Sequence, residues 1–153
     1  MKFNDLSLDR REHLNTVSSE WTDFSSIGPA KKLEKRMVKI MRKNGGIGLA
    51  ANQIGLDKRV FVMVMPNGKA MAIFNPVIHE YSNEMTYLEE GCLSFPNEFL
   101  RINRPDVIRA SFFESNGRKK ENIMLRGKYA KCFQHELDHL NGITYHARVD
   151  TAP

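Results

Sequence analysis

The sequence predicts an α+β fold in which antiparallel strands and hairpins pack around a C-terminal helix, with one earlier amphipathic helix. Apolar residues at helical spacing mark residues 29–44, an Asn-Gly stop signal closes a second helix over 127–141, and strand-like runs separated by turns fill the interval. The 153 residues are 41% hydrophobic and 27% charged, as in ordinary globular proteins, and no apolar run is long enough to span a bilayer. One domain over residues 1–153 is expected.

The first helix is predicted from Pro29, which suits a first helical turn, to about Asn44. Core-type residues follow at i, i+4, i+7 and i+8, namely Leu33, Met37, Ile40 and Met41. The other face carries six cations, namely Lys31, Lys32, Lys35, Lys39, Arg42 and Lys43. Such a strip can face RNA or simply face water, and the second reading is the more common for charge runs.

Six extended segments are predicted between the helices: 59–65, 71–75, 77–81, 84–88, 106–114 and 119–125. Asn67-Gly68 and Asn116-Gly117 suit the positive φ angles of tight turns, so the first two and the last two segments are expected to form hairpins. Pro76 is expected to end the second segment. Residues 1–27 are expected to form loops and short turns.

Ile47 to Gly55 form a run of small residues that contains an amide, Gln53. Absent or tiny side chains let a backbone approach another segment or a bound ligand closely. A tight loop packed on the core is the other reading, because a glycine pair alone is a weak signal.

The C-terminal helix contains Gln134-His135-Glu136-Leu137-Asp138-His139. His135 and His139 lie one turn apart on one face, so both imidazoles can hold one metal ion. Glu136 would lean into the same pocket, placed to move protons rather than to bind metal. The H-E-x-x-H string also occurs by accident with surface histidines, so it needs structural context.

A catalytic metal site needs a third protein ligand and one open position, and Cys92, Cys132 and His146 are the candidates. The Cα of Cys132 would lie about 10.5 Å along the helix axis from that of His139, so Cys132 is expected to be packing or pocket wall. Cys92 can approach from outside the helix, next to Gly91, although a buried structural cysteine is its alternative. His146 is the weaker candidate. A disulfide is not favoured, because nothing in the sequence directs the chain to secretion.

Three motifs occur in order along the chain: Gly46-Ile47-Gly48-Leu49-Ala50-Ala51-Asn52-Gln53, Glu90-Gly91-Cys92-Leu93-Ser94 and Gln134-His135-Glu136-Leu137-Asp138-His139. Together they resemble the three motifs of peptide deformylases, and the similarity runs from about Leu8 to Tyr145. The resemblance implies that Cys92, His135 and His139 hold the metal, with water in the fourth place, and that Glu136 is the catalytic acid/base. It also implies that the Gln53 side-chain N–H and the Leu93 backbone N–H stabilise the oxyanion.

The implied activity is metal-dependent hydrolysis that removes the N-formyl group from the formylmethionine of nascent peptides and releases formate. The implied ion is Fe²⁺ in the cell, with Zn²⁺, Ni²⁺ or Co²⁺ possible in purified protein. The residues expected to bind the peptide are Ile47, Gly48, Gly91, Leu88 and Cys132. An H-E-x-x-H metalloprotease is the alternative, which the cysteine ligand disfavours. A structural metal module without turnover is the third reading.

Two departures from the family pattern stand out. Lys128 and Lys131 occupy places that are usually apolar in the methionine pocket, and their ammonium groups are expected to point to water. The chain stops at Pro153 without the further C-terminal helix of bacterial members, which resembles the short forms encoded by bacteriophages. The net charge of +5 permits a transient ribosome contact. No membrane and no stable nucleic-acid complex are expected, and the expected location is the bacterial cytoplasm, in a phage-infected host if the phage resemblance holds.

Overall fold

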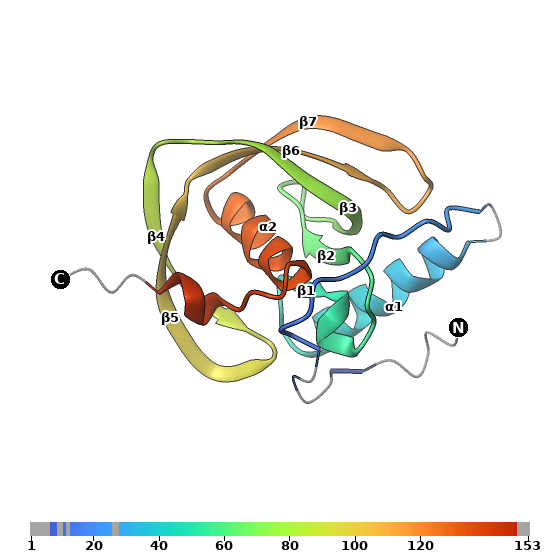
Figure 1. The fold of residues 1–153 in the computed structure, drawn as a ribbon, viewed down its shortest axis with the longest axis horizontal. Coiled ribbons are helices and arrows are strands. Elements are labelled where there is room, and N and C mark those ends of the chain that lie inside the picture. The colour runs from blue at the N-terminus through green and yellow to red at the C-terminus, as the bar shows by residue number, and fades with distance from the viewer. Residues whose placement is uncertain (1–6, 9–10, 12, 26–27, 150–153) are drawn as a thin grey trace.

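The computed structural model describes residues 7–8, 11, 13–25 and 28–149, and Figure 1 shows its fold. The elements in chain order are α1 Pro29–Lys43, β1 Gly48–Ala50, the 3₁₀ turn η2 Ala51–Ile54, β2 Val60–Val64, β3 Ala70–Tyr81, β4 Met85–Cys92, β5 Phe95–Pro105, β6 Val107–Phe113, β7 Lys119–Arg126, α2 Gly127–Leu140 and the 3₁₀ turn η3 Tyr145–Arg148. Two helices and antiparallel sheets confirm the predicted α+β fold class. No helix within the described ranges is long and apolar enough to cross a membrane.

Two antiparallel sheets frame the C-terminal helix. Five strands pair in the order β1-β2-β3-β6-β7, and β4 pairs with β5 in a separate two-stranded sheet. In Figure 1, α2 lies between the β4–β5 pair and the larger sheet, while α1 lies beyond β1 and β2, nearer the N-terminus.

Strand β2 is buried on both faces because one helix packs on each. Val62 joins the apolar cluster that contains the buried residues of α1. Phe61, its neighbour, joins the cluster of α2, where its ring centroid lies 5.0 Å from that of Phe133. Successive side chains of a strand point to opposite faces, which explains the alternation. Packing against β2 buries one face of α2, and the H-E-x-x-H motif is therefore in the interior of the protein.

The prediction that Pro76 ends a strand is wrong. Strand β3 continues through it to Tyr81, and the register against β6 shifts between Phe74 and Val77. Asn75 has a φ of 51°, in the left-handed region that asparagine tolerates. A proline at such a bulge removes no regular ladder hydrogen bond, so the strand bends there and continues.

Strand β5 was not among the predicted segments. After Cys92 the chain turns at Leu93 and Ser94 and returns along β4 as a hairpin, in which Cys92 pairs with Phe95 and Glu90 with Leu100. The small-residue run also contains regular structure, in β1 and η2, rather than only a tight loop. Cys92 therefore sits at the end of a paired strand.

Candidate active site

Three side chains that can ligate a metal converge where β4 meets α2. His135 and His139 come from α2, and Cys92 is the last residue of β4. Their ligand atoms all lie within 4.8 Å of one another, and all three residues are buried. The Cys92 Sγ and His139 Nε2 atoms are 3.3 Å apart. Sulfur and nitrogen ligands of one tetrahedral ion lie about 3.5 Å apart, so the cluster is consistent with a divalent metal.

A buried chain of ion pairs orients the first histidine. Glu90 Oε1 lies 2.8 Å from His135 Nδ1, which leaves Nε2 as the ring nitrogen available to a metal. Arg104 donates to both carboxylate oxygens of Glu90, at 2.6 and 3.1 Å, and to Asp138 at 2.8 Å. Arg148 of η3 donates to Asp138 from the other side. Burial alone would raise the pKa of Glu90, but the hydrogen bonds from His135 and Arg104 keep it below its ordinary value.

The surroundings of the two histidines favour a cation. Burial lowers the pKa of His135, but Cys92 and Glu90 outweigh that effect and raise the pKa to about 10. Groups that favour a proton at this position also favour a metal ion. Burial and the neighbouring His135 lower the pKa of His139 well below its ordinary value, so this ring is neutral, as a metal ligand must be.

Glu136 lies beside this cluster with no hydrogen-bond partner for Oε1 among the described residues. Burial raises its pKa to about 7, and a divalent ion nearby would lower the pKa again by favouring the carboxylate. Gly48 makes space for the carboxylate, because a Cβ there would lie 2.8 Å from Cys132 Sγ and 3.0 Å from Glu136 Cδ. Any residue larger than glycine at position 48 would displace the Glu136 carboxylate from this position.

The Gln53 amide is held with its N–H groups toward the metal ligands. The Ala50 backbone N–H donates to Gln53 Oε1 at 2.8 Å, which fixes the amide so that Nε2 faces the other way. Nε2 donates to Ser94 Oγ at 2.9 Å and lies 3.6 Å from Cys92 Sγ. A donor fixed in this way needs no reorganisation to meet a developing negative charge.

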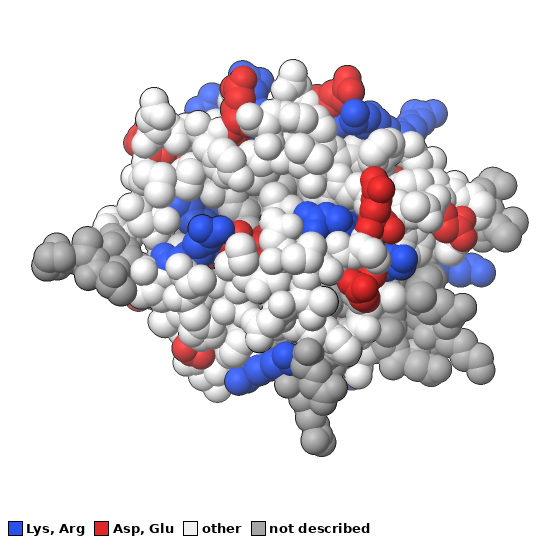
Figure 2. Space-filling model, viewed as in Figure 1, with Lys and Arg blue, Asp and Glu red and all other residues white. Residues whose placement is uncertain are grey.

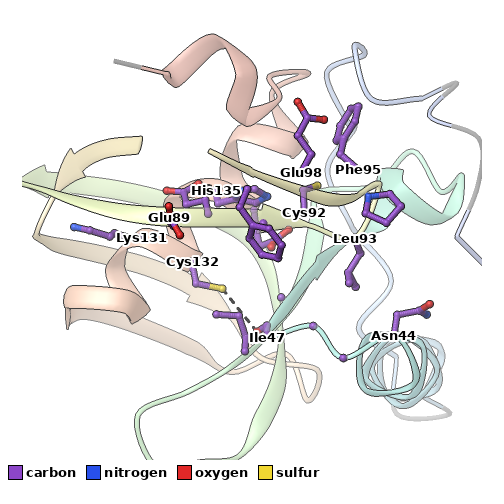
Figure 3. A pocket seen from close by; sticks show the side chains of 18 of the residues that line it. Asn44, Ile47, Glu89, Cys92, Leu93, Phe95, Glu98, Lys131, Cys132 and His135 are labelled. Atoms are coloured by element: carbon purple, nitrogen blue, oxygen red, sulfur yellow. Dashed lines mark hydrogen bonds and ion pairs between the residues drawn. The ribbon is translucent and has the colours of Figure 1, made fainter. Parts of the chain in front are cut away.

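All five residues predicted to bind the peptide line one cavity of about 470 Å³, namely Ile47, Gly48, Leu88, Gly91 and Cys132. The same cavity is lined by Gln53, Cys92, Leu93, His135 and Glu136. In Figure 3 the Cys132 sulfur points toward Ile47, whose carbonyl oxygen lies 3.7 Å away. Every predicted site residue therefore borders one space, except His139, which is fully buried.

Comparison with known proteins supports the same chemistry. The family model for polypeptide deformylase matches residues 5–152. The chain belongs to the peptide deformylase family. As a member it removes the formyl group from N-terminal formylmethionine. The chain is 42% identical to the peptide deformylase of Thermotoga petrophila over 122 residues, which cover 80% of this chain and 73% of that protein.

Solved deformylases share the fold. The crystal structure of peptide deformylase from Thermotoga maritima matches with a TM-score of 0.86 at 36% identity, covering 95% of this chain and 96% of that one. A peptide deformylase from Acinetobacter baumannii with Met-Ala-Ser bound matches with a TM-score of 0.83 at 28% identity, covering 94% of this chain and 96% of that one. The resemblance to bacteriophage-encoded short forms stays a prediction.

The two lysines of this deformylase differ in their surroundings. Lys128 is exposed. Lys131 is buried, donates to Thr86 Oγ1 and has Asp106 Oδ1 at 3.6 Å, so the prediction that its ammonium points to water is wrong. An unpaired buried charge would be costly, and these two partners stabilise it. In Figure 3 its nitrogen points away from Cys92 and Ile47, although Lys131 still lines the cavity.

The other two metal-ligand candidates of this deformylase, Cys132 and His146, are not members of the cluster. His146 Nε2 lies 2.9 Å from Glu98 Oε1 on the exposed side of η3, and both cysteines are free thiols, as expected. Sequence reasoning missed the orienting contact of Glu90 and the contribution of Arg104. A sequence feature could have predicted the role of Glu90, because its carboxylate lies two residues before Cys92. No such feature indicated Arg104, because it lies in β5, a strand that was not predicted.

Proposed function

We propose that this deformylase holds one divalent ion on Cys92, His135 and His139, uses Glu136 as its acid/base, and uses Gln53 and Leu93 as oxyanion donors. The observation that carries the proposal is the buried Glu136 carboxylate, which has a free oxygen beside a cluster of three donors. Three protein ligands leave one position of a tetrahedral ion open, which is the pattern of catalytic rather than structural sites.

A divalent ion bound there would supply Lewis acidity toward the formyl carbonyl and lower the pKa of a water molecule. Glu136 accepts a proton at Oε1 and passes it to the nitrogen of the leaving amine. The Gln53 Nε2–H and the Leu93 backbone N–H donate to the carbonyl oxygen as negative charge develops on it. Burial of these groups excludes bulk water, so each interaction is stronger than it would be at the surface.

The peptide is proposed to bind as an extra strand. Among the described residues, strand β1 is at the edge of its sheet and pairs only with β2, so its other edge is open to a peptide backbone. Ile47 and Gly48 on that side, with Gly91 opposite, give the backbone room to approach. Leu88 and Cys132 border the methionine side chain. A peptide deformylase from Acinetobacter baumannii was solved with Met-Ala-Ser bound.

Iron is the proposed ion in the cell. Thiolate and imidazole ligands suit Fe²⁺, Zn²⁺, Ni²⁺ and Co²⁺ alike, and the affinity order alone favours zinc over iron. The availability of each metal ion therefore decides which one is bound, and Zn²⁺, Ni²⁺ or Co²⁺ would bind to the same three ligands after purification. We also propose that residues 1–153 form one catalytic domain, which acts on nascent chains in the bacterial cytoplasm through transient ribosome contact.

The test is formate release from formyl-Met-Ala-Ser by protein prepared anaerobically with Fe²⁺, compared with Glu136→Ala. The native protein is expected to release formate, and Glu136→Ala is expected to retain its metal while losing activity by about 10²–10⁴. Cleavage of an unformylated peptide would instead support the metalloprotease alternative. Full activity of Glu136→Ala would overturn the proposed mechanism.

A further inference from the structure

One face of α1 carries cations alone. We name it the basic strip, made of Lys31, Lys32, Lys35, Lys39, Arg42 and Lys43. These six are the exposed residues of the helix, and all its other residues are half-buried or buried. At 3.6 residues per turn they fall within an arc of about 120° over about 18 Å of helix. The strip is therefore one continuous surface.

No described acidic residue forms an ion pair with the strip. Glu34, the only acidic residue of α1, is turned inward and accepts hydrogen bonds from the Ala72 N–H and the Ser115 hydroxyl, each at 2.8 Å. By contrast, Figure 2 shows acidic and basic side chains interspersed over the face that it presents.

Helix stability explains only the end of the strip, because Arg42 and Lys43 stand in the last turn, where the helix dipole favours cations. Lys31 and Lys32 stand in the first turn, where the helix dipole disfavours cations, and that turn has no acid. Lys35 and Lys39 complete a ladder of like charges at i, i+4 that runs from Lys31 to Lys43, and such pairs repel. A helix face that only contacts water is more stable when positive and negative side chains alternate. Repulsion among the cations of the basic strip destabilises the helix in the free protein, and a polyanion bound beside them would relieve that repulsion.

The strip also leads to the active site. Helix α1 ends at Lys43, and the next three residues, Asn44, Gly45 and Gly46, line the catalytic cavity. In Figure 3, Asn44 lies at the end of this helix, on the side of the cavity formed by Leu93. The C-terminal end of the basic strip therefore adjoins residues that line the catalytic cavity.

We propose that the basic strip docks this deformylase on the phosphate backbone of ribosomal RNA, with the cleft mouth toward the emerging peptide. The inference rests on the proposed function, since the ribosome carries the substrate. Phosphate contacts need only cations, whereas a stable protein interface needs apolar or aromatic anchors at its centre. The strip exposes no such anchor. Binding of this kind is salt-sensitive and transient.

The experiment compares Lys31→Glu/Lys35→Glu with a matched control, Lys69→Glu/Arg118→Glu, in two exposed hairpin turns. Each pair of substitutions replaces two positive charges by two negative ones and takes the net charge from +5 to +1. Binding is measured to purified bacterial ribosomes and to deproteinised ribosomal RNA between 50 and 200 mM salt. The strip variant is expected to bind both at least about tenfold more weakly at low salt, and a single Lys35→Gln to reduce the salt slope by about one.

Each result decides the inference. Weaker binding by the strip variant than by the control, on both ribosomes and RNA, supports it. Equally weakened binding in both variants would show that only the net charge matters. Weakened binding to ribosomes but not to RNA would show that the strip contacts an acidic protein. Either result overturns the inference, and so does unchanged binding of the strip variant. Formate release from free formyl-Met-Ala-Ser is expected to be unchanged in both variants, so failure of docking is distinguishable from failure of the proposed function.

Discussion

Replacing Gly48 by alanine tests how closely β1 and α2 must fit. Gly48 lies in β1 and is not among the residues with a positive φ, so alanine strains no backbone dihedral. The added methyl group would lie 2.8 Å from Cys132 Sγ and 3.0 Å from Glu136 Cδ, and the carboxylate oxygen Oε2 is nearer still. Because both neighbours are buried on α2, the Glu136 carboxylate has to move.

The magnitude follows from the overlap. Ordinary contact begins at 3.4 Å, so the acid must retreat by roughly half an ångström or more, and misplacement of a catalytic group by about 1 Å costs about 10²-fold in rate. We expect kcat for formyl-Met-Ala-Ser to fall about 10²-fold. Overpacking is expected to lower the free energy of unfolding by about 1–3 kcal/mol. The metal content should not change, since the three atoms nearest the methyl group belong to Glu136 and Cys132 and not to a metal ligand.

The assay is formate release with kcat and KM determined separately, together with metal analysis and thermal unfolding. Cys132→Ala is the matched variant, because it removes the sulfur that the added methyl group would meet at 2.8 Å. Gly48→Ala/Cys132→Ala should regain part of the kcat that Gly48→Ala loses. A Gly48→Ala protein with wild-type kcat would refute the reasoning, and one that had lost its metal would show that the damage lies in the ligands instead.

Gln53→Ala should lower kcat by about 10²–10³ with the metal retained; loss of metal would contradict the assigned donor role. Glu90→Gln should weaken metal affinity by about 10–100-fold in a chelator competition, because His135 loses the carboxylate that orients it, whereas Glu89→Gln, at an exposed neighbour, should leave the affinity unchanged. Removal of the metal with a chelator should lower Tm, because an ion at 100 times its Kd adds about 2.7 kcal/mol to the free energy of unfolding; an unchanged Tm would exclude tight binding by the folded protein. Lys31→Glu should raise the free energy of unfolding by a few tenths of a kcal/mol or more, since it places an acid at the helix N-terminus; a lower Tm would contradict the electrostatic cost assigned to the basic strip.

Local pattern was enough to predict both helices. The bounds of α1 and α2 agree with a proline start, helical spacing and an Asn-Gly stop, because each signal acts within a few residues of the chain. The strands were harder. The polar sequence of β5 carries no clear alternation, so its pairing with β4 appears only in the fold.

The sequence by itself determined that two histidines and one glutamate share a helix, and its three ordered motifs identified the family. Only the tertiary structure decided that the Cys92 sulfur meets both imidazoles, that Glu90 orients His135, and that Gly48 leaves room for Glu136. Helical spacing is a local property of the backbone, whereas these contacts join β1, β4 and α2, which are distant in sequence. Packing of the β4–β5 hairpin and the larger sheet around α2 brings them together.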